Sequence, residues 1–337
     1  MRRGPLLALA LASLATDACL HVLDRCGPAS AGAALECPVP EWFDRAFAVH
    51  VPARWDGKSA LPLIVAFHGG GGNRAAAEQV TCPDGEKGGA RCLAAIANAA
   101  GYVVIFPDGT GTRPTRNVRT WNAGGGTGGW HCVSAGACEE GVDDVAYFDA
   151  LLAEVRRVVP VDPRRVFLTG LSNGGAIAHR LACERGTTIA AIAPVGGTNQ
   201  FAAAGGRCDA RVPVLHVHGT EDPCWGYATT DATCSILKPG RKVGVVESME
   251  GWRVRNGCAA TATESAMPDL DPGDGTRITR RAFDGCAAAT EHLRVDGGGH
   301  TWPGGHQYLS VDTIGRVSND LVASAEIVRF FDAHPRP

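Results

Sequence analysis

The sequence predicts an α/β fold built on a mostly parallel sheet. The runs "LPLIVAF" (61–67) and "YVVIF" (102–106) are apolar throughout and lead into glycine- or proline-containing turns. Strands buried on both faces have this pattern, whereas half-exposed strands alternate apolar and polar residues. Between Val142 and Val159, apolar residues recur every three or four positions, which predicts an amphipathic helix. Because such strands and helices alternate along the chain, we expect helices on both faces of the sheet.

The remaining elements continue this alternation to the end of the chain. The run "CLAAIANAAGY" (92–102) has helical composition and a glycine stop, and Asn319–His334 predicts a closing amphipathic helix. A helix is also expected directly after Ser172, over "NGGAIAHRLACE". Further buried strands are predicted at 165–170, 189–197, 212–219 and 291–299.

Composition and the N-terminal residues indicate an exported protein with one catalytic domain. The chain has 337 residues and a net charge of −3, and it lacks the basic stripe of a nucleic-acid-binding protein. Arg2 and Arg3 precede the short apolar run "LLALALASLA", so residues 1–18 are predicted to be a signal peptide rather than a transmembrane span. We expect a Cys-containing N-terminal segment over 19–45, a single domain over 46–337, and a secreted, extracellular location.

The cysteines support the same compartment. Cleavage after Ala18 would leave Cys19 first, so a lipid anchor at Cys19, with a periplasmic or lipid-anchored location, is an alternative, although Asp17 fits a lipobox poorly. If Cys19 is removed or acylated, 12 of the 13 cysteines remain, an even number. The sequence contains no CxxC motif, which favours disulfides over a metal cluster. Our hypothesis pairs sequence neighbours: Cys26 with Cys37, Cys82 with Cys92, Cys132 with Cys138, Cys183 with Cys208, Cys224 with Cys234, and Cys258 with Cys286.

The stretch "TGLSNGG" contains the pattern Gly170-Leu171-Ser172-Asn173-Gly174 between a predicted strand and a predicted helix. G-x-S-x-G alone is a weak signal in a glycine-rich chain, but the strand–turn–helix setting is that of a nucleophile elbow. Such a turn leaves no room for bulky neighbours and places the serine at a helix N-terminus, where negative charge is stabilised. Ser172 is therefore the predicted nucleophile, and an N-cap serine in a plain turn is the alternative.

A serine nucleophile needs a base and an acid that orients the base, and in this architecture the chain order is serine, acid, histidine. Asp222 and His300 each follow a predicted strand, at the edge of the sheet where α/β proteins hold their ligands. We expect these two residues to complete the triad, with Glu221 and Asp231 as competing acids. The other histidines weighed for the role of base, which we assign to core or surface positions, are His179, His216, His218, His292 and His306.

The third predicted element is an oxyanion hole. The loop "FHGGGG" follows the first strong strand, and an HGG-type loop of this kind lends one backbone N–H while the residue after the nucleophile lends another. The donors would be Gly70 (or Gly69) and Asn173. His68 is expected to brace the loop rather than to catalyse. A phosphate-binding loop is the alternative, but the run lacks the GKS or GKT ending.

With these motifs in view, the chain resembles the secreted polyhydroxybutyrate depolymerase/feruloyl esterase family of α/β-hydrolases, including the LpqC-like bacterial esterases. The resemblance covers about 61–305 through "LPLIVAFHGGGG", "WNAGGGTGGWHC", "GVDDVAYFDALLAEV", "VDPRRVFLTGLSNGGAIAHRLACE", "IAPVGG", "PVLHVHGTEDP" and "GGGHTWPGG". It implies a disulfide-stabilised α/β-hydrolase fold and a serine esterase whose triad positions are Ser172, Asp222 and His300. It also implies no metal and no organic cofactor.

The resemblance identifies the type of reaction more closely than it identifies the substrate. The expected activity resembles that of a polyhydroxybutyrate depolymerase, which acts on polyester oligomers. Feruloyl or acetyl esters linked to plant polysaccharides are the alternative substrates, and a serine peptidase on the same fold is a third, less favoured interpretation. Trp302, two residues from the predicted base, is expected to bind substrate, as are Trp121 and Trp130. Core packing is the alternative for Trp121 and Trp130.

Overall fold

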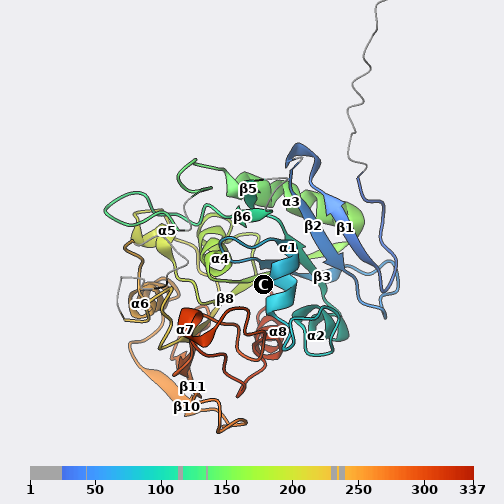
Figure 1. The fold of residues 1–337 in the computed structure, drawn as a ribbon. Helices are drawn as coiled ribbons and strands as arrows, with labels where there is room; N and C mark the ends of the chain where they lie inside the picture. The colour runs from blue at the N-terminus through green and yellow to red at the C-terminus, as the bar shows by residue number, and fades with distance from the viewer. Residues whose placement is uncertain (1–24, 43, 113–116, 134–135, 229–233, 235–239) are drawn as a thin grey trace, which may run out of the picture.

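The computed structural model describes residues 25–337, except 43, 113–116, 134–135, 229–233 and 235–239. A ten-stranded sheet with the order β1-β2-β4-β3-β7-β8-β9-β12-β11-β10 runs through the described part of the chain (Figure 1). The six strands from β4 to β12 are parallel, whereas β1 and β2 at one edge and β11 and β10 at the other are antiparallel. The predicted α/β class with a mostly parallel sheet is confirmed.

The strands of the large sheet include every buried strand predicted from the sequence. In sheet order they are β1 (Ala34–Pro38), β2 (Ala46–His50), β4 (Val103–Pro107), β3 (Leu61–Phe67), β7 (Val161–Leu171), β8 (Ala191–Val195), β9 (Val214–Gly219), β12 (Thr290–Asp296), β11 (Arg277–Phe283) and β10 (Ala262–Ala266). A separate two-stranded sheet joins β5 (Thr110–Thr112) to β6 (Val118–Thr120).

Helices cover both faces of the sheet. The longer ones are α1 (Arg74–Val80), α2 (Leu93–Ala99), α3 (Asp144–Val158), α4 (Asn173–Glu184), α6 (Val245–Arg255) and α8 (Ala323–Ala333). Short helices are η1 (Pro40–Trp42), α5 (Gln200–Ala203) and α7 (Val311–Ile314). The closing helix α8 starts four residues later than Asn319, and in the segment before it the Asp320 side chain accepts the N–H groups of Leu270 and Asp271.

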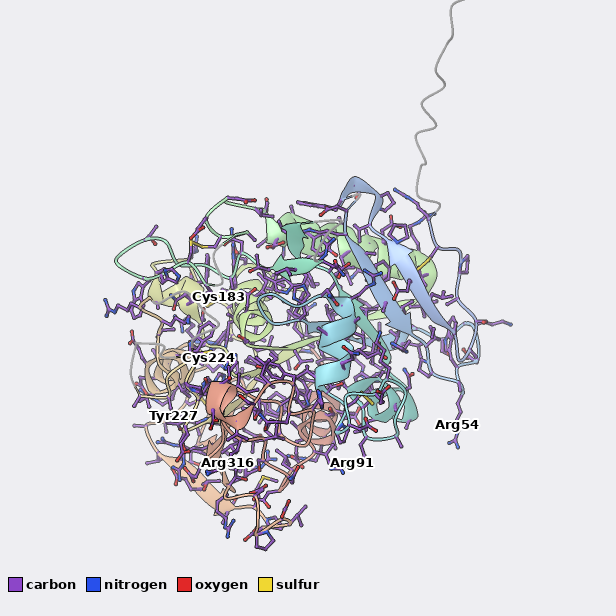
Figure 2. The ribbon with its side chains drawn as sticks, in the orientation of Figure 1. Arg54, Arg91, Cys183, Cys224, Tyr227 and Arg316 are labelled. Carbon is purple, nitrogen blue, oxygen red and sulfur yellow. A yellow bond between two sulfur atoms is a disulfide. The ribbon has the colours of Figure 1, made fainter. Side chains whose placement is uncertain are left out.

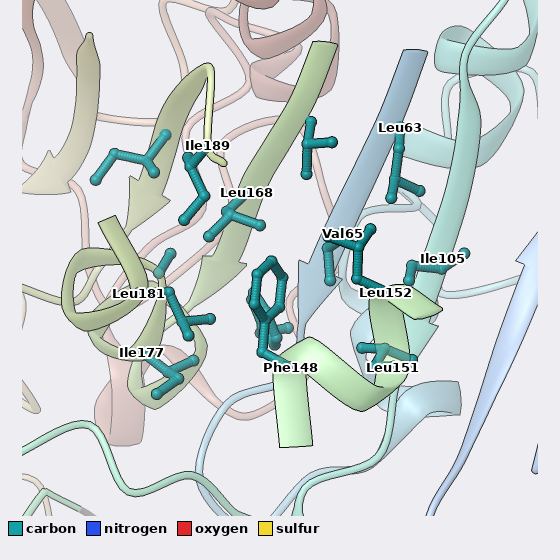
Figure 3. Close-up of a cluster of buried hydrophobic side chains, with 14 of the residues drawn as sticks. Leu63, Val65, Ile105, Phe148, Leu151, Leu152, Leu168, Ile177, Leu181 and Ile189 are labelled. Carbon is teal, nitrogen blue, oxygen red and sulfur yellow. The ribbon is translucent and has the colours of Figure 1, made fainter. Parts of the chain in front are cut away.

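Side-chain alternation along β3 shows how one strand serves two cores. Leu63 and Val65 pack toward Phe148 of α3 and Ile177 of α4 (Figure 3). The intervening residue Ile64 belongs to the second core, with α1, α2 and α8. Because both faces are covered, every residue of β3 is buried. Its unbroken apolar run is therefore the expected sequence for this position.

The cysteine pairing hypothesis is confirmed for all six pairs among the described residues. Each disulfide joins cysteines that are neighbours in the sequence order of cysteines, with separations of 6 to 28 residues. Figure 2 labels Cys183 and Cys224, which lie in the bridges to Cys208 and Cys234.

Some predictions concern residues that the structure does not describe. The signal peptide (1–18) and Cys19 lie outside the described residues. Within the part of the chain that is described, no helix combines the length and apolar character needed to cross a membrane. The segment assigned to 19–45 contains β1, which pairs along its whole length with β2, so the described part of this segment belongs to the sheet.

Candidate active site

Ser172 lies at the turn between β7 and α4, as the elbow motif predicts. Its backbone has φ 60° and ψ −121°, a conformation that L-residues rarely adopt and that marks strained functional turns. A Cβ on Gly170 would approach the Phe67 carbonyl oxygen to 2.6 Å, and one on Gly174 would approach it to 2.2 Å. Only glycine fits at these two positions, because β3 and α4 pass so close to the turn.

Asp222 and His300 follow the neighbouring parallel strands β9 and β12, and the structure brings them together. His300 Nδ1 lies 2.7 Å from Asp222 Oδ2, and both side chains are buried. The other carboxylate oxygen, Oδ1, accepts the backbone N–H groups of Cys224 and Trp225, each at 2.8 Å. Burial alone would raise the pKa of Asp222, but His300 and His218 beside it outweigh burial and hold that pKa well below its usual range. The ionised carboxylate accepts a hydrogen bond from His300 Nδ1–H. In this tautomer Nε2 carries no hydrogen, so it can act as a base.

The loop that carries His300 is fixed on both sides. The N–H of His300 donates to the Ile314 carbonyl at 2.6 Å, and the Tyr308 hydroxyl donates to the His300 carbonyl at 3.0 Å. Gly299 lies so close to α7 that a Cβ there would come within 2.2 Å of the Ile314 oxygen. The glycines before His300 therefore allow close packing under the loop, which sets the position of the imidazole.

His68 orients the predicted oxyanion loop. Its Nε2 accepts the Gly109 N–H at 2.9 Å, so the ring proton is on Nδ1, which donates to the Gly69 carbonyl at 2.7 Å. Gly72 N–H binds the same carbonyl at 3.0 Å. In the trans peptide between Gly69 and Gly70 the carbonyl and the N–H point in opposite directions. The hydrogen bonds to the Gly69 carbonyl therefore turn the Gly70 N–H away from His68 and Gly72. Burial lowers the pKa of His68 to about 4, which keeps the ring neutral.

Asn173 and Trp121 join the elbow to this loop. The Asn173 side chain accepts the Trp121 backbone N–H at 2.7 Å and donates to its carbonyl at 3.0 Å, while the Trp121 indole donates to the His68 carbonyl at 3.0 Å. Asn173 is the first residue of α4, and a backbone N–H in the first turn has no acceptor within its own helix. The two proposed oxyanion donors, Gly70 and Asn173, are thus held by one set of hydrogen bonds.

A cavity of about 880 Å³ opens over these residues. Ser172, His300 and Gly69–Gly72 line it together, which places nucleophile, base and glycine loop on one surface. The wall contains polar and acidic residues as well as apolar ones. The polar residues are Gln79, Asp84, Glu86 and His306, and the larger apolar or aromatic ones are Val80, Leu171, Tyr308 and Leu309.

The three tryptophans predicted to bind substrate do not line this cavity. Trp121 and Trp302 are 0% and 1% exposed, and Trp130 is 9% exposed. The Trp302 indole donates to Ser324 of α8 at 3.2 Å, and the Arg241 guanidinium lies 3.9 Å above the Trp130 ring. The structure therefore places none of the three side chains in the wall of this cavity, and a position in a loop could not distinguish a buried tryptophan from one at the rim.

The site is not arranged to hold a metal. Asp222, His300 and Cys224 bring potential ligand atoms within 4.8 Å of one another. However, Cys224 Sγ is bonded to Cys234, and a disulfide sulfur is not the thiolate that binds metals. The remaining His–Asp pair is already joined by its own hydrogen bond. The competing acid Glu221 points to Arg316 on the surface, and Asp231 lies outside the described residues.

Comparisons with known proteins bear on the fold and on the class of reaction. No protein-family model matches the chain. The chain is 30% identical over 308 residues to "Putative esterase NocK" of Nocardia uniformis subsp. tsuyamanensis, covering 85% of this chain and 78% of that protein. It is 29% identical over 168 residues to feruloyl esterase D of Neurospora crassa, covering half of each. The solved acetyl xylan esterase from Aspergillus awamori has a similar fold, with a TM-score of 0.52 at 15% identity, over 80% of this chain and 94% of that one.

The fold and these relatives define a carboxylic ester hydrolase of the α/β-hydrolase superfamily. The chain belongs to the esterase family that includes NocK. It spans most of NocK but only half the length of feruloyl esterase D, so the similarity to the latter concerns part of that protein.

Proposed function

We propose that the protein is a secreted serine esterase that uses Ser172, His300 and Asp222 as its triad. The observation that carries the proposal is the joint position of Ser172 and His300 on one cavity, with His300 bound to Asp222 at 2.7 Å. The strained backbone of Ser172 supports the role of nucleophile. Six disulfides support an oxidising, extracellular compartment.

The reaction is acyl transfer to water in two halves. Ser172 attacks the ester carbonyl while His300 Nε2 takes its proton, and Asp222 stabilises the imidazolium that forms. The N–H groups of Gly70 and Asn173 bind the oxyanion of the tetrahedral intermediate. His300 then gives the proton to the leaving alcohol, and a water molecule releases the acid by the same steps in reverse.

The preferred substrates are feruloyl or acetyl esters of plant polysaccharides. Relatives named feruloyl esterase and acetylxylan esterase support this class. The cavity also supports it, because Gln79, Asp84 and Glu86 offer amide and carboxylate groups that can bind the hydroxyls of a sugar. Leu171 and Leu309 give the same cavity apolar surface that can pack against an acyl group. Polyester oligomers of 3-hydroxybutyrate, the substrate of polyhydroxybutyrate depolymerases, are the competing class.

The first experiment replaces the nucleophile. We expect Ser172→Ala to reduce p-nitrophenyl acetate hydrolysis by about a million-fold relative to the parent, as in other triad enzymes, with an unchanged unfolding midpoint. Ser265→Ala, on the exposed edge strand β10, is the matched control and should retain full activity. A fluorophosphonate probe should label the parent and the control but not Ser172→Ala. Retained hydrolysis in a folded Ser172→Ala protein would exclude the proposed nucleophile.

The second experiment ranks substrates. Methyl ferulate, acetylxylan and 3-hydroxybutyrate oligomers are compared by kcat/KM under one set of conditions. The proposed class requires that one of the first two exceeds the oligomers. A preference for the oligomers would instead assign the protein to polyester degradation, while leaving the triad proposal intact.

A further inference from the structure

A row of buried imidazoles lies behind the acid of the proposed triad. His216 and His218 are on β9, and their rings stack with centroids 5.2 Å apart. His216 Nε2 lies 3.1 Å from His218 Nδ1, and His218 Nε2 lies 3.2 Å from Asp222 Oδ2. His179 of α4 and His292 of β12 each lie 5.7 Å from the His216 ring. All four histidines are buried, so this row reaches Asp222 from inside the protein.

The contacts of His218 determine where its proton lies. Its Nε2 is 2.8 Å from the Trp225 carbonyl oxygen and 3.2 Å from Asp222 Oδ2. A carbonyl and an ionised carboxylate can only accept hydrogen bonds, so Nε2 must carry a hydrogen. The contact between His218 Nδ1 and His216 Nε2 needs only one proton between them, and this proton keeps the two rings in register. His218 therefore presents a donor to the triad carboxylate in either charge state.

Asp222 Oδ2 is consequently shared between two imidazoles. His300 Nδ1 binds it at 2.7 Å from the side of the cavity, and His218 Nε2 approaches it at 3.2 Å from the core. The single Nε2–H of His218 bonds the Trp225 carbonyl at 2.8 Å and also faces this oxygen at 3.2 Å, so the positive end of its dipole restrains the carboxylate. It also draws part of the negative charge away from His300, which makes the imidazolium form of His300 less stable than it would be beside an unshared oxygen.

We propose that His218 is a positioning residue of this esterase: it fixes the Asp222 carboxylate and lowers the basicity of His300 through the shared oxygen. The proposal rests on the proposed triad. His218 touches neither the cavity nor a reacting atom, so its effect passes entirely through Asp222. The sequence run "HVHG" places it four residues before the acid, on the strand that leads to it.

The electrostatic surroundings of His218 and Asp222 come from several elements. Tyr227, labelled in Figure 2, lies edge-on to the His218 ring with centroids 6.2 Å apart. Lys242 donates to the Cys224 carbonyl at 3.1 Å and brings a positive charge near Asp222. The titratable or charged groups that face this pair are His179 of α4, His216 of β9, His292 of β12, Tyr227, Lys242, His300 and Tyr308.

The test compares side chains that keep or remove the donor at the Nε2 position. His218→Leu removes the donor, whereas the amide of His218→Gln reaches the same place. We expect His218→Leu to raise the pH of the acid limb of kcat/KM by about 0.5 to 1 unit and to lower kcat by about tenfold, with KM nearly unchanged. His218→Gln should keep the parental pH profile. His292→Gln, in the same row but without contact to Asp222, is the matched control and should also keep it.

A second comparison covers the case in which His218→Leu does not fold. The amide of His218→Asn is too short to reach Asp222, so this variant should show the shifted limb while His218→Gln does not. The proposal would be overturned if His218→Leu or His218→Asn showed the same pH profile as His218→Gln and the parent and differed only in a lower unfolding midpoint. His218 would then be a packing residue. Failure of the triad itself would instead appear as activity in Ser172→Ala, so the two failures are distinguishable.

Discussion

Acidification should destabilise this protein while its carboxylates are still ionised. Burial lowers the pKa of His68 to about 4 and of His179 and His292 to about 3, and it lowers the pKa of His216 well below its usual value. In the unfolded chain these imidazoles titrate near pH 6.5. The unfolded state therefore binds protons that the folded state does not, and the stability present above pH 6.5 is lost as the pH falls toward 4.

The size of the loss follows from the folded and unfolded pKa values. A histidine that stays neutral in the folded state changes the unfolding free energy by almost nothing at pH 7.5. At pH 5 it lowers the unfolding free energy by about 2 kcal/mol. The four histidines together cost about 8 kcal/mol, which is comparable to the whole stability of a typical domain. Burial lowers the pKa of Lys242 to about 8, so this group changes the unfolding free energy mainly above pH 7.5. The pKa of Asp222 lies below pH 5.

Urea unfolding at pH 7.5 and pH 5.0, followed by tryptophan fluorescence with the disulfides intact, measures this loss. We expect the unfolding free energy to fall by several kcal/mol between the two pH values. His292→Gln removes one of the four groups, so its loss should be smaller than the parental loss by about 2 kcal/mol. Equal stability at the two pH values, or an unchanged loss in His292→Gln, would refute the conclusion that these imidazoles are held neutral.

Two further substitutions test the packing around the site. Gly174→Ala places a Cβ 2.2 Å from the Phe67 carbonyl oxygen, so we expect the unfolding free energy to fall by at least about 3 kcal/mol. In the control Gly27→Ala no atom lies within 4 Å of the new Cβ, and the unfolding free energy should change by less than about 0.5 kcal/mol. Equal unfolding midpoints in the two variants would contradict the close approach. Arg45→Met leaves the buried Asp144 carboxylate without the guanidinium that binds it at 2.6 Å, and should cost about 3 to 5 kcal/mol by chemical unfolding. The double variant Arg45→Met/Asp144→Asn should regain part of this, and no recovery would argue against an unpaired charge as the cause.

The elements that position the site could be predicted because their signals are local. The unbroken apolar runs of β3 and β4 reflect burial on both faces. The glycines around Ser172 reflect a steric limit that no other residue meets. By contrast, β10 and β11 are mostly exposed or half-buried and rich in Arg, Thr and Glu, so no apolar period marks them. They are defined by pairing with β12, which is a long-range contact.

Side-chain environment was harder to predict than position along the chain. His218 was expected in the core and is buried there, but its contact with Asp222 depends on how the loop after β9 folds back over the strand. Trp302 lies two residues from His300, yet its ring turns inward to α8. Sequence proximity to a site residue does not fix which way a side chain points, so Trp302 lies outside the cavity wall despite its place beside His300.

The disulfide pattern has a consequence for how this protein matures. Every bridge among the described residues joins one cysteine to the next cysteine along the chain, and none encloses another. Twelve cysteines can be paired in roughly ten thousand ways. An oxidant that couples successive thiols in chain order, beginning with Cys26, reaches the native connectivity directly. Production of this enzyme in an oxidising host should therefore depend on a disulfide-forming catalyst and not on one that rearranges wrong bridges.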